Sequence, residues 1–313
     1  MRLRDGAYYK DLAQKDPLLE SGKALAPMTT FRLGGEARLF AEAGDLEALR
    51  RLALLARAEE IPSFVLGGGS DTLFDDLGLE GLALKLGGDF RKIELLGAAG
   101  DAVVARAGAG ASLAGLLESA RAWGLAGLEG LAGVPGTVGG AARGNAGAAG
   151  VSLGDRVLAL EAYFPDGDRR ETWGREKLRF GYRELSWTEG AVILSVDLGL
   201  TRSAPDKVEA KMAAALQLRR EKTPLGLSAG SVFKNPPGDF AGRLVEEAGL
   251  KGYRLGGAVV SERHANVIVN RGDASASEVR ALVAFVKFTV FKRRAVELVP
   301  EIRLVTREGR LYP

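Results

Sequence analysis

Three consecutive glycines at the end of a short apolar run constrain the fold of this chain more than any other feature of its sequence. Residues 64–66 (Phe-Val-Leu) predict a buried strand that leads directly into residues 67–70 (Gly-Gly-Gly-Ser). Upstream, residues 31–41 predict a strand, and Asp45 is a helix N-cap before an amphipathic segment that ends near residue 60. The order of strand, helix, strand and glycine loop predicts a mixed unit that ends in the loop.

The rest of the chain combines short strands with a few strong helices, which predicts an α+β fold in three parts after an N-terminal extension. The extension is residues 1–26, with a helix around residues 9–20. The parts are residues 27–86 together with 303–313, residues 87–203, and residues 204–302. Further strands are expected over residues 81–86, 157–164, 191–200, 265–269 and 300–305, and further helices over residues 112–123, 206–222, 240–248 and from about residue 275.

Missing residue types exclude several kinds of chemistry. The 313-residue chain has no cysteine, which removes disulfides, thiolate nucleophiles and Cys-type zinc sites. Its single histidine, His264, excludes a histidine metal cluster, and the Asp75-Asp76 pair is expected to be a solvated turn, so no metal is expected.

Composition and charge limit the possible partners. The composition, with 46% hydrophobic and 27% charged residues, is that of an ordinary globular protein. A net charge of +3 is too small to indicate nucleic acid, although it suits small polyanions. With no apolar leader and no run long enough to span a bilayer, we expect a cytoplasmic protein that does not bind membranes. The sequence does not determine the oligomeric state, and a monomer is favoured.

The glycine-rich segments are candidate anion sites. A strand that ends in glycines lets backbone N–H groups approach a ligand closely, which suits a diphosphate, whereas the plain alternative is a tight turn. Residues 67–71 lack the ending of a P-loop and the spacing of a dinucleotide fingerprint. Residues 132–150 carry seven glycines and could supply further donors, or could be a flexible linker. Val134, Pro135 and Asn145 within that segment favour an ordered loop.

Polar residues in three other segments are candidates for the chemistry. Residues 228–236 bring Ser231, Lys234 and Asn235 close together in what could be an ordinary loop before Pro236. Arg183 lies between two strand-like stretches and could bind a planar carboxylate, or could be a surface arginine. Glu301 starts an apolar strand, so its carboxyl is either partly buried with a raised pKa or a charge at a strand edge.

Taken in order, these stretches resemble the UDP-N-acetylenolpyruvoylglucosamine reductase (MurB) family of flavoenzymes over nearly the whole chain after residue 28. The likeness depends on the order and spacing of many short motifs, each of which is weak alone. The motifs are residues 30–35 (Thr-Phe-Arg-Leu-Gly-Gly), 66–70, 133–140 (Gly-Val-Pro-Gly-Thr-Val-Gly-Gly), 145–148 (Asn-Ala-Gly-Ala), 180–183 (Phe-Gly-Tyr-Arg), 228–236, 249–252, 261–266 and 300–301.

The resemblance implies a two-part FAD-binding module of the vanillyl-alcohol-oxidase type and a C-terminal α+β substrate-binding domain. It also implies non-covalent FAD, NADPH as co-substrate and a UDP-sugar substrate. Arg183, Ser231 and Glu301 match the catalytic positions of the family. The implied FAD-binding residues are Arg32, Gly67, Gly68, Gly69, Ser70, Asp71, Gly136, Thr137, Gly139, Gly140, Asn145 and Gly147, and the implied substrate-binding residues are Tyr182, Lys222, Lys234 and Asn235.

The implied reaction is reduction of UDP-N-acetylglucosamine enolpyruvate to UDP-N-acetylmuramate for peptidoglycan. Hydride arriving at the terminal carbon of the enol ether pushes negative charge toward the adjacent carbon and the carboxylate. Arg183, with a protonated Glu301, would stabilise that charge, and Ser231 would deliver the proton, assisted by Lys234 or by a water.

The chain departs from the family pattern at two notable positions. Asp71 replaces the usual Asn beside the flavin diphosphate, and Ser186 lies one place later than usual after Arg183. Two alternatives therefore stay open. A flavoprotein oxidase of the same FAD fold would often attach its flavin covalently through His or Cys, which this chain scarcely offers. A non-catalytic paralogue that binds flavin or a nucleotide sugar would be expected to have lost Ser231 or Glu301.

Overall fold

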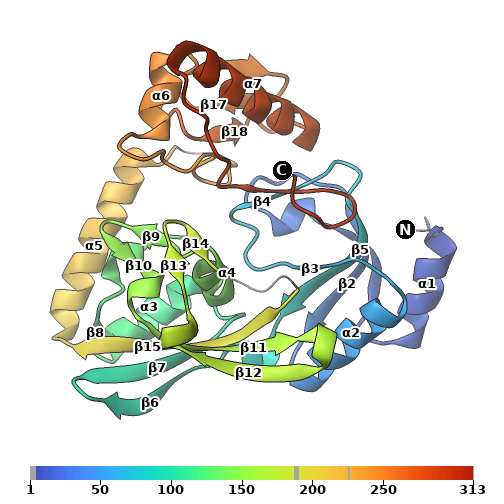
Figure 1. Cartoon of the computed structure of the whole chain (residues 1–313), viewed down its shortest axis with the longest axis vertical. Coiled ribbons are helices and arrows are strands. Elements are labelled where there is room, and N and C mark those ends of the chain that lie inside the picture. The colour runs from blue at the N-terminus through green and yellow to red at the C-terminus, as the bar shows by residue number, and fades with distance from the viewer. Residues whose placement is uncertain (1–4, 187–189, 225, 313) are drawn as a thin grey trace.

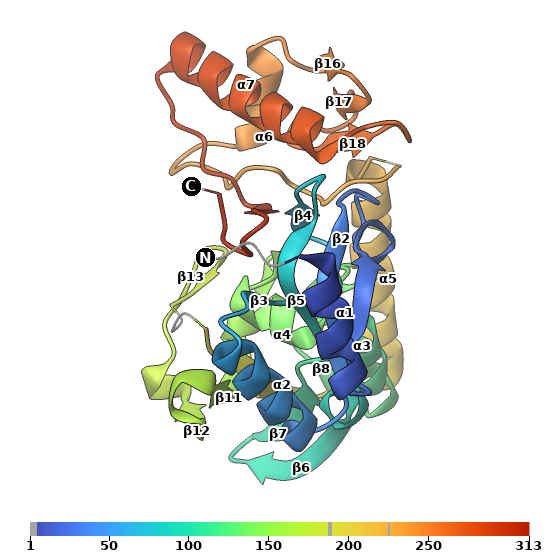
Figure 2. The ribbon, with the colours of Figure 1, turned by 90° about the vertical axis from the view of Figure 1, so that its right-hand side faces the viewer.

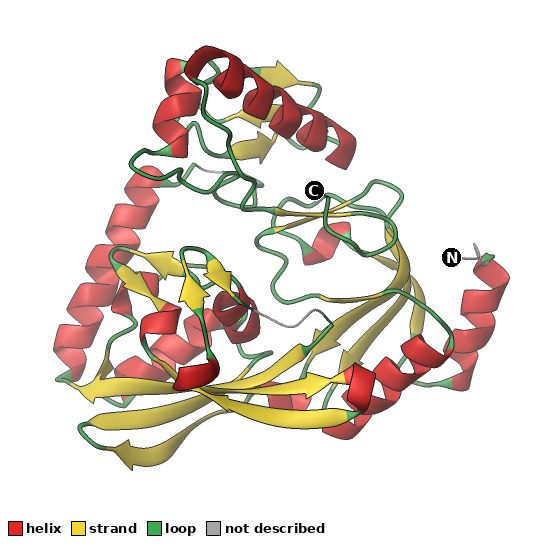
Figure 3. Ribbon diagram, viewed as in Figure 1, coloured by secondary structure: helices red, strands yellow, loops and turns green. Residues whose placement is uncertain are grey.

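The structure is a computed structural model that describes residues 5–186, 190–224 and 226–312. It consists of three regions, each with a principal sheet of its own (Figure 1). Helices and strands are mixed along the chain, as the colouring in Figure 3 shows, so the predicted α+β class is confirmed. The described helices include none that is both long and apolar enough to cross a membrane.

The first region is a four-stranded sheet with strand order β1-β2-β5-β3. Strand β1 (Glu20–Ala24) is antiparallel to β2 (Glu36–Ala43), while β2 and β3 (Ser63–Val65) are parallel to β5 (Leu79–Leu86). Helices α1 (Gly6–Lys15) and α2 (Leu46–Ala58) pack on β2. Strand β4 (Thr72–Phe74) pairs with the distant strand β19 (Arg303–Val305) in parallel. Asp45 caps α2 as predicted, since its side chain accepts a hydrogen bond from the Ala48 N–H.

The second region is an antiparallel sheet with strand order β12-β11-β15-β7-β6, with β8 beside β15. Its strands are β6 (Ile93–Ala99), β7 (Ala102–Gly108), β8 (Leu125–Ala126), β11 (Val157–Phe164), β12 (Arg169–Gly174) and β15 (Val192–Arg202). The short helix α4 (Val138–Arg143) packs on β15 and β7, and α3 (Leu113–Ala122) contacts β8 and α4. Two small hairpins lie beside them, β9 (Gly147–Ala148) with β10 (Val151–Ser152) and β13 (Phe180–Gly181) with β14 (Glu184–Leu185).

Helix α5 (Pro205–Lys222) runs along the second region and leads to the third (Figures 1 and 2). The third region holds helices α6 (Ala241–Glu247) and α7 (Ala276–Arg294) and the strands β16 (Arg254–Leu255), β17 (Ala258–Val260) and β18 (Ile268–Asn270). Its core is continuous with Phe31, Leu33 and Leu73 of the first region. Apolar packing therefore joins the third region to the first.

Asp76 is exposed in a turn, as predicted, but Asp75 and Asp76 also connect these two regions. Asp76 accepts hydrogen bonds from the N–H groups of Ala276 and Ser277 at the start of α7. Asp75 Oδ2 lies 2.9 Å from Arg280 Nη1 and accepts a hydrogen bond from the Tyr312 hydroxyl. Because a carboxylate satisfies N–H groups that a helix start leaves free, the pair holds α7 against the first region.

Several predicted elements have different bounds, for local reasons. The helix expected over residues 9–20 is α1, which begins after the Asp5 cap and ends at Lys15 because Pro17 disfavours helix at Asp16. The strand expected over residues 31–41 is β2, which begins only at Glu36, since Gly34 has φ +116° and Gly35 lies closely against the 76–78 turn. Of the strand expected over residues 300–305, only residues 303–305 form β19, because Pro300 bridges to Phe233 instead.

Candidate active site

Arg183 occupies a two-residue turn between β13 and β14. Its φ of 55° lies in the left-handed region, which few residues other than glycine adopt outside tight turns. The guanidinium extends to the neighbouring hairpin, where Nη1 donates to the Gly147 carbonyl at 2.7 Å. Nε lies 2.9 Å from Glu301 Oε1, but in a geometry that leaves this buried N–H without a hydrogen bond. The turn therefore joins an arginine of the second region to a carboxyl group near the end of the chain.

Ser231 and Glu301 are brought together by backbone pairing. Residues 231–235 run between two extended segments, with Ser231 bridged to Val267 on one side and Phe233 bridged to Pro300 on the other. The Glu301 N–H donates to the Val232 carbonyl at 2.7 Å. Predicted catalytic residues from three distant parts of the sequence thus lie around one point where the regions meet.

The Glu301 carboxyl is three-quarters buried, and its environment favours the protonated form. Burial raises its pKa above the usual value, and the nearby Asp71 charge acts in the same direction. The Arg183 and Lys234 charges oppose this shift without cancelling it. Glu301 is therefore better suited to hold a proton than an ordinary surface glutamate.

We expect the stability of the protein to depend on pH through Glu301. The pKa of Glu301 is higher in the folded state than in the unfolded state. The protonated carboxyl therefore contributes fully to the free energy of unfolding below the unfolded pKa, and this contribution is lost as pH rises through the folded pKa. The variant Glu301→Gln should therefore gain free energy of unfolding relative to the wild type as pH rises above the usual glutamate pKa of 4.5. Urea unfolding across this rise in pH measures this. A pH-independent difference would contradict the assignment.

Asn266 holds the Ser231 segment in place. Its side-chain amide donates to the Phe233 carbonyl at 2.8 Å, and its carbonyl oxygen accepts from the Phe233 N–H at 2.9 Å. The Asn266 N–H in turn donates to Nδ1 of His264, whose pKa is lowered by burial and by the neighbouring Lys251 and Lys222 charges. His264 is thus part of a turn that supports Asn266, and this turn explains why β18 begins at Ile268 rather than at residue 265.

Replacement of Asn266 by alanine should destabilise the protein by about 2–4 kcal/mol, because two buried backbone groups lose their partners. It should also lower activity in the molecules that remain folded, since Ser231 is two residues from Phe233. Asn270→Ala is the matched control, because its amide donates to the Phe31 carbonyl away from Ser231. Denaturant unfolding and steady-state kinetics of both variants test this. An equal loss of activity in both would show that the Asn266 effect is not local.

The two glycine-rich segments lie against each other. A Cβ atom on Gly68 would lie 2.6 Å from the Gly136 Cα, and one on Gly67 would lie 2.7 Å from the Thr137 hydroxyl. Gly69 has φ +61°, and its Cβ would collide with the Met28 carbonyl. Gly67 and Gly68 are therefore required by the close approach of the first region to the second, and Gly69 by a close approach within the first region, in addition to any approach of a ligand.

The residues at this contact fit the diphosphate of FAD. Within the described residues, no acceptor pairs with the backbone N–H groups of residues 67–70, which are available to an anion. The α4 segment offers fewer donors than predicted, because the N–H groups of Val138 and Gly139 bond to carbonyls of the 109–111 loop and that of Gly140 bonds to the Thr137 hydroxyl. The 67–70 loop is thus the stronger candidate for backbone contacts.

Other predicted cofactor residues have partners within the protein. Asn145, which is buried, donates to the Gly181 carbonyl and accepts from the Gly154 N–H. It therefore ties the 145–154 segment to the hairpin that carries Arg183. The exposed Arg32 donates to the Pro27 carbonyl, and Ser70 donates to the Pro135 carbonyl.

Asp71 is turned toward protein groups. Its carboxylate accepts a hydrogen bond from the Thr72 hydroxyl at 2.9 Å, its backbone carbonyl accepts from Arg303, and its charge acts on Glu301. The Asp71 carboxylate therefore helps to raise the pKa of Glu301, the proposed catalytic acid.

The predicted substrate residues fall into two groups. Tyr182 is exposed, and its hydroxyl accepts a 3.4 Å hydrogen bond from the Asn235 N–H, which joins the second region to the third. The Asn235 side chain accepts from the Ala241 N–H at the start of α6, and Lys234 lies near Glu301. Lys222, in contrast, ends α5 and is exposed beside His264.

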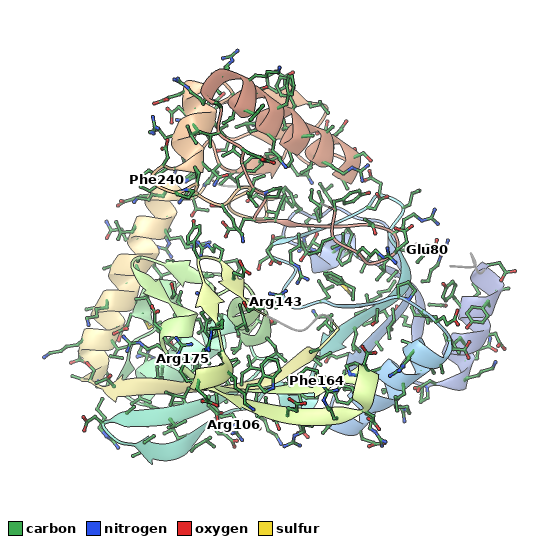
Figure 4. The ribbon with its side chains drawn as sticks, in the orientation of Figure 1. Glu80, Arg106, Arg143, Phe164, Arg175 and Phe240 are labelled. Atoms are coloured by element: carbon green, nitrogen blue, oxygen red, sulfur yellow. The ribbon has the colours of Figure 1, made fainter. Side chains whose placement is uncertain are left out.

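Sequence reasoning missed two arginines at this meeting point. Arg219 on α5 packs against Gly133 near Arg183, and burial lowers its pKa. It follows the buried Ala215 by one helical turn, so helical periodicity could have placed it on the inner face. Arg143 on α4, labelled in Figure 4, donates to the Leu185 carbonyl, and burial together with the Arg303 charge lowers its pKa. These cations favour polyanionic ligands.

Comparison with known proteins gives consistent matches along the chain. Residues 37–172 match the family model described as FAD binding domain, and residues 222–305 match that of the UDP-N-acetylenolpyruvoylglucosamine reductase C-terminal domain. A reductase of that name from Symbiobacterium thermophilum is 40% identical over 294 residues, which cover 93% of each chain. One from Agathobacter rectalis is 39% identical over 286 residues, covering 88% of this chain and 90% of the relative. The crystal structure of the Thermus caldophilus enzyme superposes with a TM-score of 0.77 and 35% identity, over 91% of this chain and 97% of the other.

Proposed function

Because the chain belongs to the UDP-N-acetylenolpyruvoylglucosamine reductase family, we propose that it reduces UDP-N-acetylglucosamine enolpyruvate to UDP-N-acetylmuramate in peptidoglycan synthesis. FAD, once reduced by NADPH, supplies the hydride that the enolpyruvyl group takes up at its terminal carbon. The observation that carries the proposal is the convergence of Arg183, Glu301 and the Ser231 segment at one point. The free N–H groups of the 67–70 loop beside it support the binding of FAD.

The roles of the three residues follow from where negative charge and the proton must go. Hydride addition leaves negative charge on the adjacent carbon and the carboxylate, which the Arg183 guanidinium stabilises as a fixed cation. A protonated Glu301 donates a hydrogen bond to the same oxygens, in keeping with its raised pKa. Ser231 gives its hydroxyl proton to the adjacent carbon. Lys234 or a water would restore that proton.

We assign substrate binding to Tyr182, Asn235, Lys234 and Lys222, with Arg219 added near Arg183. The Tyr182–Asn235 contact supports this, because it joins the second region to the third and Tyr182 belongs to the same turn as Arg183. We also propose that residues 27–86 with 303–313 and residues 87–203 form the two parts of the FAD-binding module. The segment expected to be an N-terminal extension adds α1 and the edge strand β1 to the first of these parts. Residues 204–302 would then form the substrate domain, which is supported by the pairing of β19 with β4, since this pairing returns the chain to the first region after residue 302.

The visible spectrum of the purified protein during stepwise anaerobic addition of ligands tests the proposal. We expect a flavin spectrum that bleaches with NADPH and returns when UDP-N-acetylglucosamine enolpyruvate is added. A flavin that is reoxidised only by oxygen would instead identify an oxidase of the same fold. A protein that binds no flavin would contradict both enzymatic functions.

A further inference from the structure

The last turn of α5 is held by little apolar packing. Of the residues of this helix, only Val208 and Ala215 are buried, and every residue from 216 to 222 is half-buried or exposed. A helix end leaves backbone carbonyls without partners, and an end that also lacks buried side chains opens readily. Figures 1 and 2 show that this end of α5 lies beside the third region. The support for the last turn therefore has to come largely from polar contacts.

Arg263 of the third region supplies this support. Its Nη2 donates to the carbonyls of Arg220 and Glu221, both at 2.7 Å, and its Nε donates to the Glu221 carbonyl at 3.0 Å. Among the residues that the structure describes, no other side chain bonds to either carbonyl. A guanidinium at this end is also attracted by the partial negative charge of the helix C-terminus. Three hydrogen bonds from one planar group thus close the end of α5.

The backbone of Arg263 belongs to the turn that also supports the Ser231 segment. The buried Ser261 begins this turn, and its Oγ accepts a hydrogen bond from the Arg263 N–H at 3.2 Å. Asn266 follows in the same turn and holds Phe233 through both groups of its side-chain amide. Arg263 therefore ties the end of α5 to the part of the third region that carries the proposed acid.

The last turn of α5 carries Arg219, which lies near a second arginine. A Cβ atom on Gly133 would lie 3.0 Å from the Arg219 Cδ, so this side chain packs against the loop before α4. Burial lowers the pKa of Arg219, and the nearby Arg183 charge acts in the same direction. Within the described part of the chain, no carboxylate offsets this repulsion at Arg219. Two like charges stay close only where the backbone that carries them is fixed.

We propose that Arg263 is a positioning residue, which fixes the last turn of α5 and so holds Arg219 beside Arg183, where both cations act on the same anionic substrate. This inference rests on the proposed function, and it assigns Arg263 a role through Arg219 rather than through contact with the substrate. The apparent affinity of a ligand falls with the fraction of molecules in the binding conformation. Loss of the Arg263 contacts therefore weakens substrate binding through the population of molecules in which the last turn is formed.

Titration calorimetry of the FAD-loaded, oxidised protein with UDP-N-acetylglucosamine enolpyruvate tests the proposal. We expect Arg263→Met to raise the dissociation constant about tenfold, which corresponds to a last turn formed in about a tenth of the molecules. Arg263→Lys should lie between this variant and the wild type, because one ammonium replaces only part of the planar fork.

Arg293→Met is the matched control. Arg293 Nη1 donates to the Ala248 carbonyl at 2.7 Å, so it makes the same kind of contact at the end of another helix of the third region, α6. This variant should bind the sugar within about twofold of the wild type, since it lies outside the coupled group. Urea unfolding of both methionine variants shows whether a difference in affinity could follow from stability alone. An equal loss of affinity in the control would overturn the proposal.

A double-mutant cycle tests whether Arg263 acts through Arg219. In an Arg219→Gln background, Arg263→Met should raise the dissociation constant by less than about twofold, because the side chain that it positions is already gone. An undiminished effect in that background, or wild-type affinity in Arg263→Met alone, would overturn the proposal while leaving the proposed function intact. A wild type that does not bind the sugar at all would instead overturn the proposed function and this inference with it.

Discussion

Replacing Ser231 by alanine is expected to slow the reaction of the reduced enzyme with the enolpyruvyl sugar by a factor of about 10²–10⁴, which is the usual contribution of a positioned general acid. The variant should still fold, because the Ser231 segment is held by backbone pairing and by Asn266. Bleaching of the flavin by NADPH should be nearly unchanged. Anaerobic stopped-flow measurement of the two half-reactions separates these effects.

Ser228→Ala is the matched control, because Ser228 lies in the same segment three residues before the proposed acid. It should leave both half-reactions close to the wild-type rates. If Ser231→Ala reoxidised as fast as the wild type, the proton would have to come from another group. Lys234 and a protonated Glu301 would then be the next candidates, since both lie at the same point.

Arg183→Lys should lower kcat/KM for the enolpyruvyl sugar by about 10²–10³, although it keeps the positive charge. A lysine has no planar fork, so it cannot bond to the Gly147 carbonyl and face Glu301 and a substrate carboxylate at the same time. Position 183 in the turn has a positive φ, which the lysine must adopt just as the arginine does, so the backbone strain is the same in both proteins. The substitution therefore tests the geometry of the guanidinium rather than its charge.

Steady-state kinetics with NADPH in excess measure this effect. Arg179→Lys is the control, because Arg179 lies four residues earlier and bonds to local backbone carbonyls. An Arg183→Lys enzyme with normal kcat/KM would show that a point charge is sufficient and that bidentate binding of the carboxylate plays no part.

Elements governed by local chemistry could be predicted from the sequence. Asp45, Ser112 and Ser275 cap α2, α3 and α7 because each side chain accepts a hydrogen bond from a backbone N–H three residues later. Strand β11 has the predicted bounds, since its mostly apolar run Val157–Phe164 is followed directly by the short 3-10 turn Pro165–Gly167. Signals of this kind act over a few residues and need no knowledge of the partner elements.

The parts of the site that depend on distant pairing could be anticipated only through the family resemblance. No local pattern indicates that Glu301 donates its N–H to Val232, or that Asn266 holds Phe233 on both sides. Asn145 was predicted to contact FAD, and its structural bonds to Gly181 and Gly154 depend on how two hairpins meet. The assignments of individual FAD-binding and catalytic residues that follow from the resemblance remain predictions for the experiments above.

The pairing of β4 with β19 has a consequence for how the chain is made. Residues 303–305 leave the ribosome about 230 residues after residues 72–74, so the strand that follows the 67–70 loop has no partner until those residues have been made. Hydrogen bonds from Asp75 to the Val305 carbonyl and from Glu80 to the Arg307 carbonyl extend the same late contact. A chain truncated before residue 303 would leave the glycine loop beside an open strand edge. The strand after the 67–70 loop is therefore paired only in chains that contain residues 303–305.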